Sequence, residues 1–186
     1  MRRTDYIYFL IDNSNSMNGF KLGSVNDAIT NIIHRLKRNI NKKDVCLKII
    51  VMTFSDAVSW SNTIPVELNK FVFVDVQVGG KETKIGEAYR ELYEKLLRQE
   101  EVGNNSTDET TIIMFSDGIS TDSFEDELKL LKQNTIFTKS NRIAFTFDGF
   151  AKVISVNSLG DFVSQGTNII IEDFVALNKM IFEKYR

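Results

Sequence analysis

Residues able to hold a metal ion follow directly on the first apolar run of the chain. This run, 6–11, is followed at once by the polar stretch 12–16. Asp12, Ser14 and Ser16 place a carboxylate and two alternate hydroxyls at the end of a buried strand, so three oxygen ligands reach one point. Mg²⁺ prefers oxygen ligands in octahedral geometry, and Mn²⁺ and Ca²⁺ are alternatives. The pattern therefore indicates a site for a small, hard cation.

Two later segments carry oxygen ligands of the same kind. Thr83 opens a predicted helix after Gly79-Gly80, and Asp117 follows the apolar run 110–115. Both positions fall at the carboxyl end of a strand or at the start of a helix. Open α/β sheets bind their ligands at this edge. The three segments therefore sit where such a fold places its ligand site.

The elements that position these residues alternate between helix and strand. Apolar residues recur every three or four positions from 19 to 38, which predicts a helix with one buried face. The apolar run 45–54 predicts a strand covered on both faces, and 58–60 pairs with it as a hairpin at a sheet edge. The remaining predicted strands lie at 71–76, 110–115, 142–147 and 168–171. The remaining predicted helices are one with its buried stripe over 85–96, one over 124–131, a short one around 158–163 and a last one from 172 onward. Ser123 or Asp122 is expected to cap the helix over 124–131.

This alternation predicts the fold class. Strands that alternate with helices form a sheet in which neighbouring strands run parallel and helices cover both faces. We expect a doubly wound α/β fold with a mostly parallel central sheet and one antiparallel edge strand. The chain contains no internal repeat, linker or low-complexity tract. One domain is therefore expected to cover residues 1–186.

Composition and charge exclude several classes of protein. The 186 residues are 42% hydrophobic and 26% charged, and a formal net charge of −2 gives no basic excess for nucleic acid. Cys46, the single cysteine, excludes a disulfide within the chain and is interpreted as a core thiol. The run 6–11 is too short for a signal peptide, and no stretch approaches the about 20 apolar residues of a membrane span. We expect a cytoplasmic protein without nucleic-acid or membrane partners.

Taken together, the three polar segments resemble a known family. The motifs D-x-S-x-S-M at 12–17, G-G-x-x-T-x-x-G-x-A at 79–88 and S-D-G at 116–118 look like those of a von Willebrand factor A domain. In that family they form the metal-ion-dependent adhesion site. The resemblance implies that Ser14, Ser16 and Thr83 bind Mg²⁺ through their hydroxyls and that Asp12 and Asp117 act directly or through water.

The resemblance also implies how such a site works. When neutral hydroxyls and waters dominate the ligands, the cation keeps much of its charge uncompensated and favours a carboxylate oxygen from outside. A partner protein would supply this Asp or Glu, and no catalytic residues are expected. The chain further resembles small stand-alone bacterial A domains of the tellurium-resistance TerY group, which implies a kinase or phosphatase partner in a resistance or stress-response system.

Two positions depart from the family pattern. Asn15 stands where the family usually has Gly, and Lys84 follows the threonine. Asn tolerates left-handed backbone angles better than most residues, so the loop need not be broken. If Lys84 points inward, we expect it to weaken metal binding by like-charge repulsion.

Each motif also has a simpler interpretation. Ser14 and Thr83 fit helix caps, and Asp117-Gly118 fits a turn, when each is taken alone. Asp56 and Asp122 are interpreted as solvated loop charges, and 147–150 as a turn bordering the site. The combination of all the motifs in order favours the metal site over these interpretations.

Other functional classes fit the sequence less well. A Mg²⁺-dependent phosphohydrolase of the haloacid-dehalogenase type also ends its first strand in Asp, but that chemistry wants an acid two residues later, where this chain has Ser14. A nucleotide-binding module would need a glycine-rich phosphate loop, and neither G-x-G-x-x-G after the first strand nor G-x-x-x-x-G-K-[ST] occurs. The sequence therefore favours a binding module over an enzyme.

Overall fold

Strands and helices alternate along the chain in the computed structural model, which describes residues 3–40, 45–102, 108–117, 119–147, 159–163, 170–171 and 173–185. The strands are β1 (Arg3–Asp12), β2 (Val45–Phe54), β3 (Val58–Trp60), β4 (Val66–Glu67), β5 (Thr110–Phe115), β6 (Asn141–Phe145) and β7 (Ile170–Ile171). The helices are α1 (Phe20–Asn39), α2 (Ile85–Val102), α3 (Glu125–Leu131), α4 (Thr135–Lys139) and α5 (Phe174–Tyr185), with a 3₁₀ turn, η1 (Asn15–Met17), before α1.

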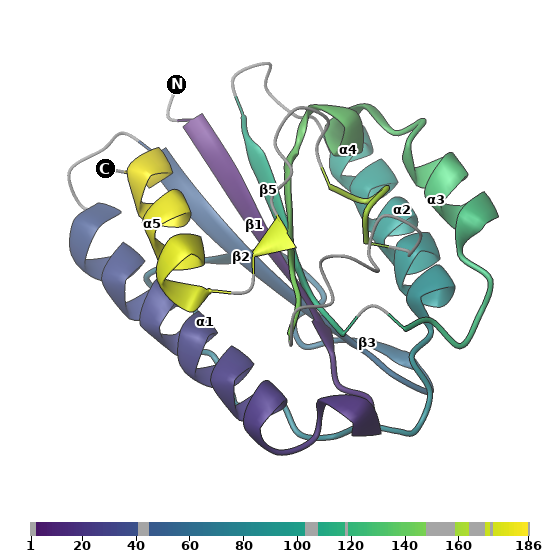
Figure 1. The fold of residues 1–186 in the computed structure, drawn as a ribbon. Coiled ribbons are helices and arrows are strands. Elements are labelled where there is room, and N and C mark those ends of the chain that lie inside the picture. Colours follow the sequence, from purple (N-terminus) through teal and green to yellow (C-terminus); the bar gives the residue numbers. More distant parts are fainter. Residues whose placement is uncertain are drawn as a thin grey trace.

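All the strands join one sheet in the order β3-β2-β1-β5-β6-β7, and β4 also pairs with β2. β2, β1, β5, β6 and β7 run parallel, whereas β3 and β4 are antiparallel to β2. Figure 1 shows α1 and α5 on one face of the sheet and α2, α3 and α4 on the other. The predicted doubly wound α/β fold with an antiparallel edge strand is confirmed. Because β1 has β2 on one side and β5 on the other, its carboxyl end is the switch point where such folds bind ligands.

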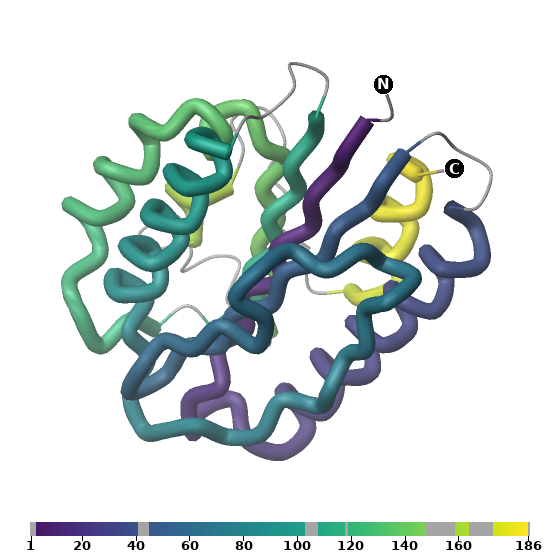
Figure 2. The backbone as a smooth tube through the Cα atoms, turned by 180° about the vertical axis from the view of Figure 1, so that it is seen from behind, coloured from purple at the N-terminus to yellow at the C-terminus, as the bar shows by residue number. Residues whose placement is uncertain are grey.

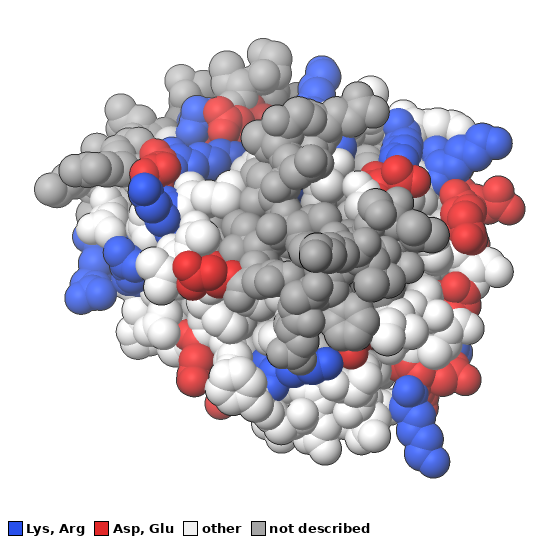
Figure 3. Space-filling view, viewed as in Figure 1, with Lys and Arg blue, Asp and Glu red and all other residues white. Residues whose placement is uncertain are grey.

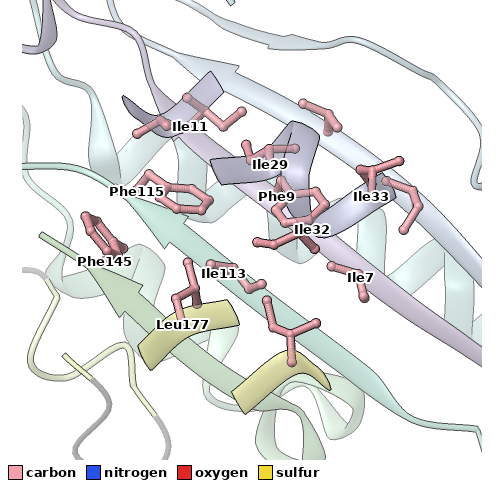
Figure 4. Packing of buried hydrophobic residues seen from close by; sticks show 14 of the residues in the cluster. Ile7, Phe9, Ile11, Ile29, Ile32, Ile33, Ile113, Phe115, Phe145 and Leu177 are labelled. Atoms are coloured by element: carbon pink, nitrogen blue, oxygen red, sulfur yellow. The ribbon is translucent and has the colours of Figure 1, made fainter. Parts of the chain in front are cut away.

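Two apolar cores lie on opposite faces of the sheet. Side chains alternate along a strand, so Ile7, Phe9 and Ile11 of β1 pack against α1 and α5, as Figure 4 shows. Tyr8 and Leu10 of the same strand join the core under α2, α3 and α4. Every one of these side chains is at most 1% exposed. The central strand is therefore packed on both faces up to the residue before Asp12.

The chain between β3 and α2 runs past the β2 edge toward the end of the sheet that carries the 12–17 loop (Figure 2). The prediction of a strand at 71–76 is wrong. This segment is extended, but it pairs with none of the described strands. Its end is held by α1: Asn26 accepts from the Val76 N–H and donates to the Val76 C=O, both at 3.0 Å. β3 and β4 already occupy the outer edge of β2. The alternation of buried Phe71 with exposed Val72 and Val74 therefore marks an extended connection.

Several smaller predictions also differ from the structure. β6 ends at Phe145 instead of 147, residues 159–163 form turns instead of a helix, and α5 begins at Phe174. Cys46 is half-buried and not a core thiol. The short elements η1, β4 and α4 were not predicted. The predictions that fall on 148–158, 168–169 and 172 lie outside the described residues.

The described surface carries charges of both signs. On the face shown in Figure 3, basic and acidic side chains are interspersed around the rim instead of being gathered by sign. Within the described ranges, no helix combines the length and the apolar character needed to cross a membrane.

Candidate metal centre

Asp12, the last residue of β1, is fully buried at the switch point of the sheet. Its Oδ1 accepts from the Ser14 backbone N–H at 2.9 Å, and its Oδ2 accepts from the Ser116 hydroxyl at 2.7 Å. Burial raises the pKa of Asp12 above its ordinary value, although the hydrogen bonds from Ser14 and Ser116 oppose this rise. The carboxylate is thus fixed by neutral partners from two strand ends.

The two serine hydroxyls of the loop lie together. Ser14 Oγ and Ser16 Oγ are 2.9 Å apart, with Ser14 buried and Ser16 exposed. Ser14 precedes η1, but its side chain makes no capping hydrogen bond, and Gly19 stands at the start of α1. The interpretation of Ser14 as a simple helix cap therefore does not hold, and its hydroxyl faces its neighbour instead.

Asn15 does not strain this loop. It is the first residue of η1, and 3₁₀ turns use right-handed angles that any residue adopts. The residue that takes a left-handed conformation here is Gly19, with φ of 78°. The departure from glycine at position 15 is therefore harmless to the backbone.

Asp117 follows β5, the strand beside β1, and its carboxyl is buried. Its Oδ1 has no hydrogen-bond partner among the described residues. Its Oδ2 lies 3.4 Å from the Lys21 ammonium. A buried acceptor without a partner is costly, so Oδ1 is an oxygen that a bound cation would satisfy.

Thr83 lies buried in the connection that leads into α2. Its N–H donates to Thr121 Oγ1 at 3.0 Å, and the Thr121 N–H donates to the Thr83 C=O at 2.9 Å. These bonds join the Thr83 segment to the loop that follows Asp117. Capping of α2 falls to Asp122, which accepts from Gly86 N–H and Glu87 N–H at 2.9 Å each. The interpretation of Asp122 as the cap of α3 or a solvated charge is therefore wrong. α3 has Phe124 at its cap position and no side-chain cap, so the predicted cap by Ser123 is wrong as well.

Close backbone contacts hold the 79–82 turn against the 12–17 loop. Ser14 and Gly80 form a parallel bridge, and Gly79 N–H donates to the Asn13 C=O at 2.8 Å. A Cβ on Gly79 would lie 2.4 Å from Asn13 Nδ2, and one on Gly80 would lie 2.4 Å from the Asp56 carboxyl carbon. A side chain at either position would therefore have to displace Asn13 or the Asp56 carboxylate. The Asp12 carboxylate thus contacts the Ser14 N–H, the Ser14 hydroxyl contacts that of Ser16, and the Thr83 segment is hydrogen-bonded to both neighbouring loops.

Asp56 fixes the same turn and is not merely a solvated charge. Its Oδ1 accepts from the backbone N–H groups of Lys81 and Glu82, at 2.7 Å each. The backbone hydrogen bond from Glu82, reinforced by the one from Lys81, holds the pKa of Asp56 below its ordinary value. The exposed carboxylate therefore braces the connection that carries Thr83.

The cation that approaches the site is Lys21. Lys84 forms ion pairs with Glu82 at 3.4 Å and with Glu87 at 3.9 Å. Lys21, which the sequence analysis did not single out, lies against Asp117 instead. Its signal in the sequence was weak, since it is one of several lysines near the three motifs and only the fold shows which of them reaches a carboxylate.

The donor chemistry fits a hard cation. No group of at least three His, Cys, Asp and Glu residues able to hold a metal occurs among the residues that the structure describes. A metal site here would have to draw on hydroxyls, and Ser14 and Ser16 supply them beside Asp12. Hydroxyl and carboxylate oxygens suit Mg²⁺ or Mn²⁺ and not a soft metal.

Comparison with protein families assigns the chain to a family. The chain belongs to the von Willebrand factor type A domain family, whose model matches residues 7–181. Domains of this type are in general non-catalytic modules that bind protein ligands. A search of curated proteins gives no match.

Three solved structures show the same fold. Proximal thread matrix protein 1 from the mussel byssus, with a zinc-occupied MIDAS motif, is 19% identical with a TM-score of 0.65, over 97% of this chain and 47% of that one. The ArnB paralog VWA2 from Sulfolobus acidocaldarius is 17% identical with a TM-score of 0.61, over 96% and 44%. The pilus adhesin SpaC from Lactobacillus rhamnosus GG is 10% identical with a TM-score of 0.68, over 100% and 30%. This chain thus spans less than half the length of each.

Proposed function

We propose that this protein is a metal-ion-dependent interaction module. It binds Mg²⁺ through the hydroxyls of Ser14, Ser16 and Thr83 and, directly or through water, through Asp12 and Asp117. The bound ion offers a coordination position to an Asp or Glu of a partner protein. The observation that carries this proposal is the buried Asp117 Oδ1, which lacks a hydrogen-bond partner within the described structure, at the switch point where the serine hydroxyls also lie.

The chain's own residues prepare the site without the metal. Ser116 and the Ser14 N–H fix the Asp12 carboxylate, while the Ser14–Gly80 bridge holds the Thr83 segment nearby. These side chains are already ordered before the ion binds, so little conformational entropy is lost on binding, and this favours a higher affinity. Ser16 is exposed, so the site opens to solvent and to a partner.

The geometry of Asp12 argues against the phosphohydrolase alternative. A nucleophilic carboxylate needs a free oxygen facing the substrate. Both Asp12 oxygens accept hydrogen bonds, and the side chain is 0% exposed. Sustained turnover of a generic phosphate ester that is lost in Asp12→Ala would nevertheless defeat the binding proposal.

Thermal unfolding tests the metal site. A ligand present at about 100 times its Kd adds about 2.7 kcal/mol to the free energy of unfolding, so Mg²⁺ or Mn²⁺ should raise the melting temperature by several degrees. Ser14→Ala with Ser16→Ala should abolish this rise. Ser59→Ala with Ser61→Ala, which changes exposed serines at the β3 edge, is the matched control and should keep it. A rise that persists in the site double mutant would place the metal elsewhere.

Peptide selection tests capture of an acidic side chain. The immobilised protein is panned against a random peptide display library in Mn²⁺ and eluted with chelator. We expect the selected peptides to share an Asp or Glu whose change to Asn or Gln abolishes binding. Selected peptides that lack an acidic residue, or that stay bound in chelator, would refute the proposal.

We further propose a setting for this activity. The resemblance of the motifs to the TerY group supports a cytoplasmic role in a bacterial tellurium-resistance or stress-response system, with a kinase or phosphatase as partner. A pull-down from the native host with and without Mg²⁺ would test it. Recovery of neither enzyme class in Mg²⁺ would count against this setting but not against the metal site.

A further inference from the structure

Lys21 reaches into the candidate metal site from the first turn of α1. Its Nζ lies 3.4 Å from Asp117 Oδ2, and the two side chains are 25% and 5% exposed. This is an ion pair with one largely buried partner, in which the carboxylate is held by the end of β5. The ammonium therefore lies on a carboxylate that the proposed function assigns to the metal.

The other lysine near the motifs is engaged elsewhere. Lys84 forms ion pairs with Glu82 and Glu87, which are its neighbours in the sequence. Asp12 is bonded only to neutral groups, from Ser14 and Ser116. Among the described residues, Lys21 is thus the cation that faces a site carboxylate.

An ammonium and a divalent ion cannot share Asp117 without cost. Two positive charges a few ångströms apart repel each other, and water screens this repulsion only partly beside a buried carboxylate. Asp117 also cannot give both oxygens to the metal while one holds Lys21. Oδ1 can face the metal while Lys21 stays on Oδ2, but the ammonium then repels the ion and weakens its binding until the ammonium moves away.

The local structure allows this movement. Lys21 sits on a flexible four-carbon stem, and its side chain is already 25% exposed. The ammonium can turn into water without any change in the fold.

We infer that Lys21 is a tethered counter-ion that occupies Asp117 in the metal-free protein and competes with the divalent ion for it, so that this lysine sets a reduced metal affinity. This inference rests on the proposed function, since it assigns the same site to the metal. It predicts that removal of the ammonium makes metal binding tighter, although a favourable ion pair has been lost.

Calorimetry with Mn²⁺ on chelator-stripped protein tests the inference. We expect Lys21→Met to lower the Kd about tenfold. Lys21→Arg keeps the charge and should bind Mn²⁺ about as weakly as the wild type. Lys84→Met removes the same charge from a position that pairs with Glu82 and Glu87, and it should change the Kd by no more than about twofold.

A second measurement needs no metal. In chelator, Lys21→Met should lower the melting temperature, because Asp117 loses its counter-ion, whereas Lys84→Met should leave it nearly unchanged. Opposite changes in metal-free stability and metal affinity are the signature of a competing counter-ion. This readout also shows whether the variant folds.

The outcomes separate the inference from the proposed function. Equal or weaker Mn²⁺ binding by Lys21→Met, with normal binding by the wild type, overturns the inference and leaves the metal site standing. An unchanged melting temperature of Lys21→Met in chelator also overturns it. Absence of Mn²⁺ binding in the wild type and in all variants overturns both.

Discussion

Asp5 and Asp12 lie on the same strand, β1, and both are fully buried, but their surroundings differ. Near the amino end of the strand, Asp5 Oδ2 is 2.9 Å from the Arg3 guanidinium, and its Oδ1 accepts from the Glu109 N–H at 3.2 Å. At the carboxyl end, Asp12 has only hydroxyl and amide partners, and its neighbour Asp117 keeps an oxygen without one among the described residues.

The comparison shows that burial alone does not mark a binding site. The Asp5 region is an ion network in which both carboxylate oxygens have partners, and Arg3 and Lys184 also pair with Glu109 at 3.2 Å each. The atom without a partner there is a donor, Arg3 Nε, and not an acceptor. Around Asp12 the donors are neutral, and beside it Asp117 holds one oxygen against Lys21 and keeps the other without a partner among the described residues. The first arrangement stabilises the fold, and the second leaves room for a cation from outside.

The largest expected effect on stability comes from a substitution that disturbs the close backbone contacts at the carboxyl end of the sheet. A Cβ on Gly86 would lie 2.0 Å from the Ser123 carbonyl oxygen, so Gly86→Ala should destabilise the protein by about 3 kcal/mol in urea unfolding. It should also weaken the metal-induced rise in melting temperature, because Thr83 is displaced.

Gly23→Ala is the matched control for this variant. Gly23 lies within α1 with no heavy atom within 4 Å of an added Cβ. Its replacement should stabilise the helix by up to about 1 kcal/mol. Equal effects of the two glycine variants would show that the carboxyl end has no special need for close contact.

The next largest effect is expected when the ion network around Asp5 is broken. Asp5→Ala leaves Arg3 without its closest carboxylate and the Glu109 N–H without an acceptor, which should cost about 2 kcal/mol in urea unfolding. The metal-induced rise should stay unchanged. Lys70→Ala, which removes an exposed ion pair with Glu67, should change stability by less than about 0.5 kcal/mol. If Asp5→Ala lost the metal-induced rise in melting temperature, the proposed difference between the two ends of β1 would be contradicted.

Replacement of Asp12 by the isosteric Asn should have the opposite sign. Burial raises the pKa of both carboxyls, but only Asp5 has a cation beside it, Arg3, that opposes the rise. Because burial raises the pKa of Asp12, the ionised form opposes folding. Asp12→Asn keeps an acceptor for the Ser14 N–H and should stabilise the protein in chelator, while the response to Mg²⁺ is lost. Destabilisation in chelator would mean that Asp12 is as structural as Asp5.

The smallest effect is a pH dependence of that stabilisation. The raised pKa means that the native state binds the Asp12 proton more tightly than the unfolded state. The stability gap between Asp12→Asn and the wild type should therefore be largest near pH 7 and shrink as pH falls through the raised pKa toward the ordinary value of about 3.9. Urea unfolding of both proteins in chelator over this range measures it. A gap that widens on acidification contradicts the assignment.

Local patterns predicted most of the fold. The continuous apolar runs at 45–54 and 110–115 became β2 and β5 because buried parallel strands need apolar residues on both faces. The periodicity of 19–38 became α1 for the corresponding reason. The prediction for 71–76 was wrong because alternation shows which side chains are buried and not which backbone groups pair. Here the Asn26 side chain, and not a neighbouring strand, hydrogen-bonds the Val76 backbone.

The candidate site divides in the same way. The sequence alone could group Asp12, Ser14 and Ser16, since they are neighbours in one loop. Thr83 and Asp117 could be added because their motifs follow in the order of the family pattern. The role of Asp122 as the cap of α2 could not be predicted, because its partners Gly86 and Glu87 lie on another segment.

The amino-acid sequence by itself determined the α/β class, the order of the elements and the oxygen-rich chemistry of the switch point, because these depend on residue type and spacing along the chain. Only the tertiary structure decided that Lys21 and not Lys84 faces Asp117, and that Asp5 has a charged partner while Asp12 has neutral ones. Such pairings join residues distant in sequence, and a charge acts through space according to where the folded backbone places it.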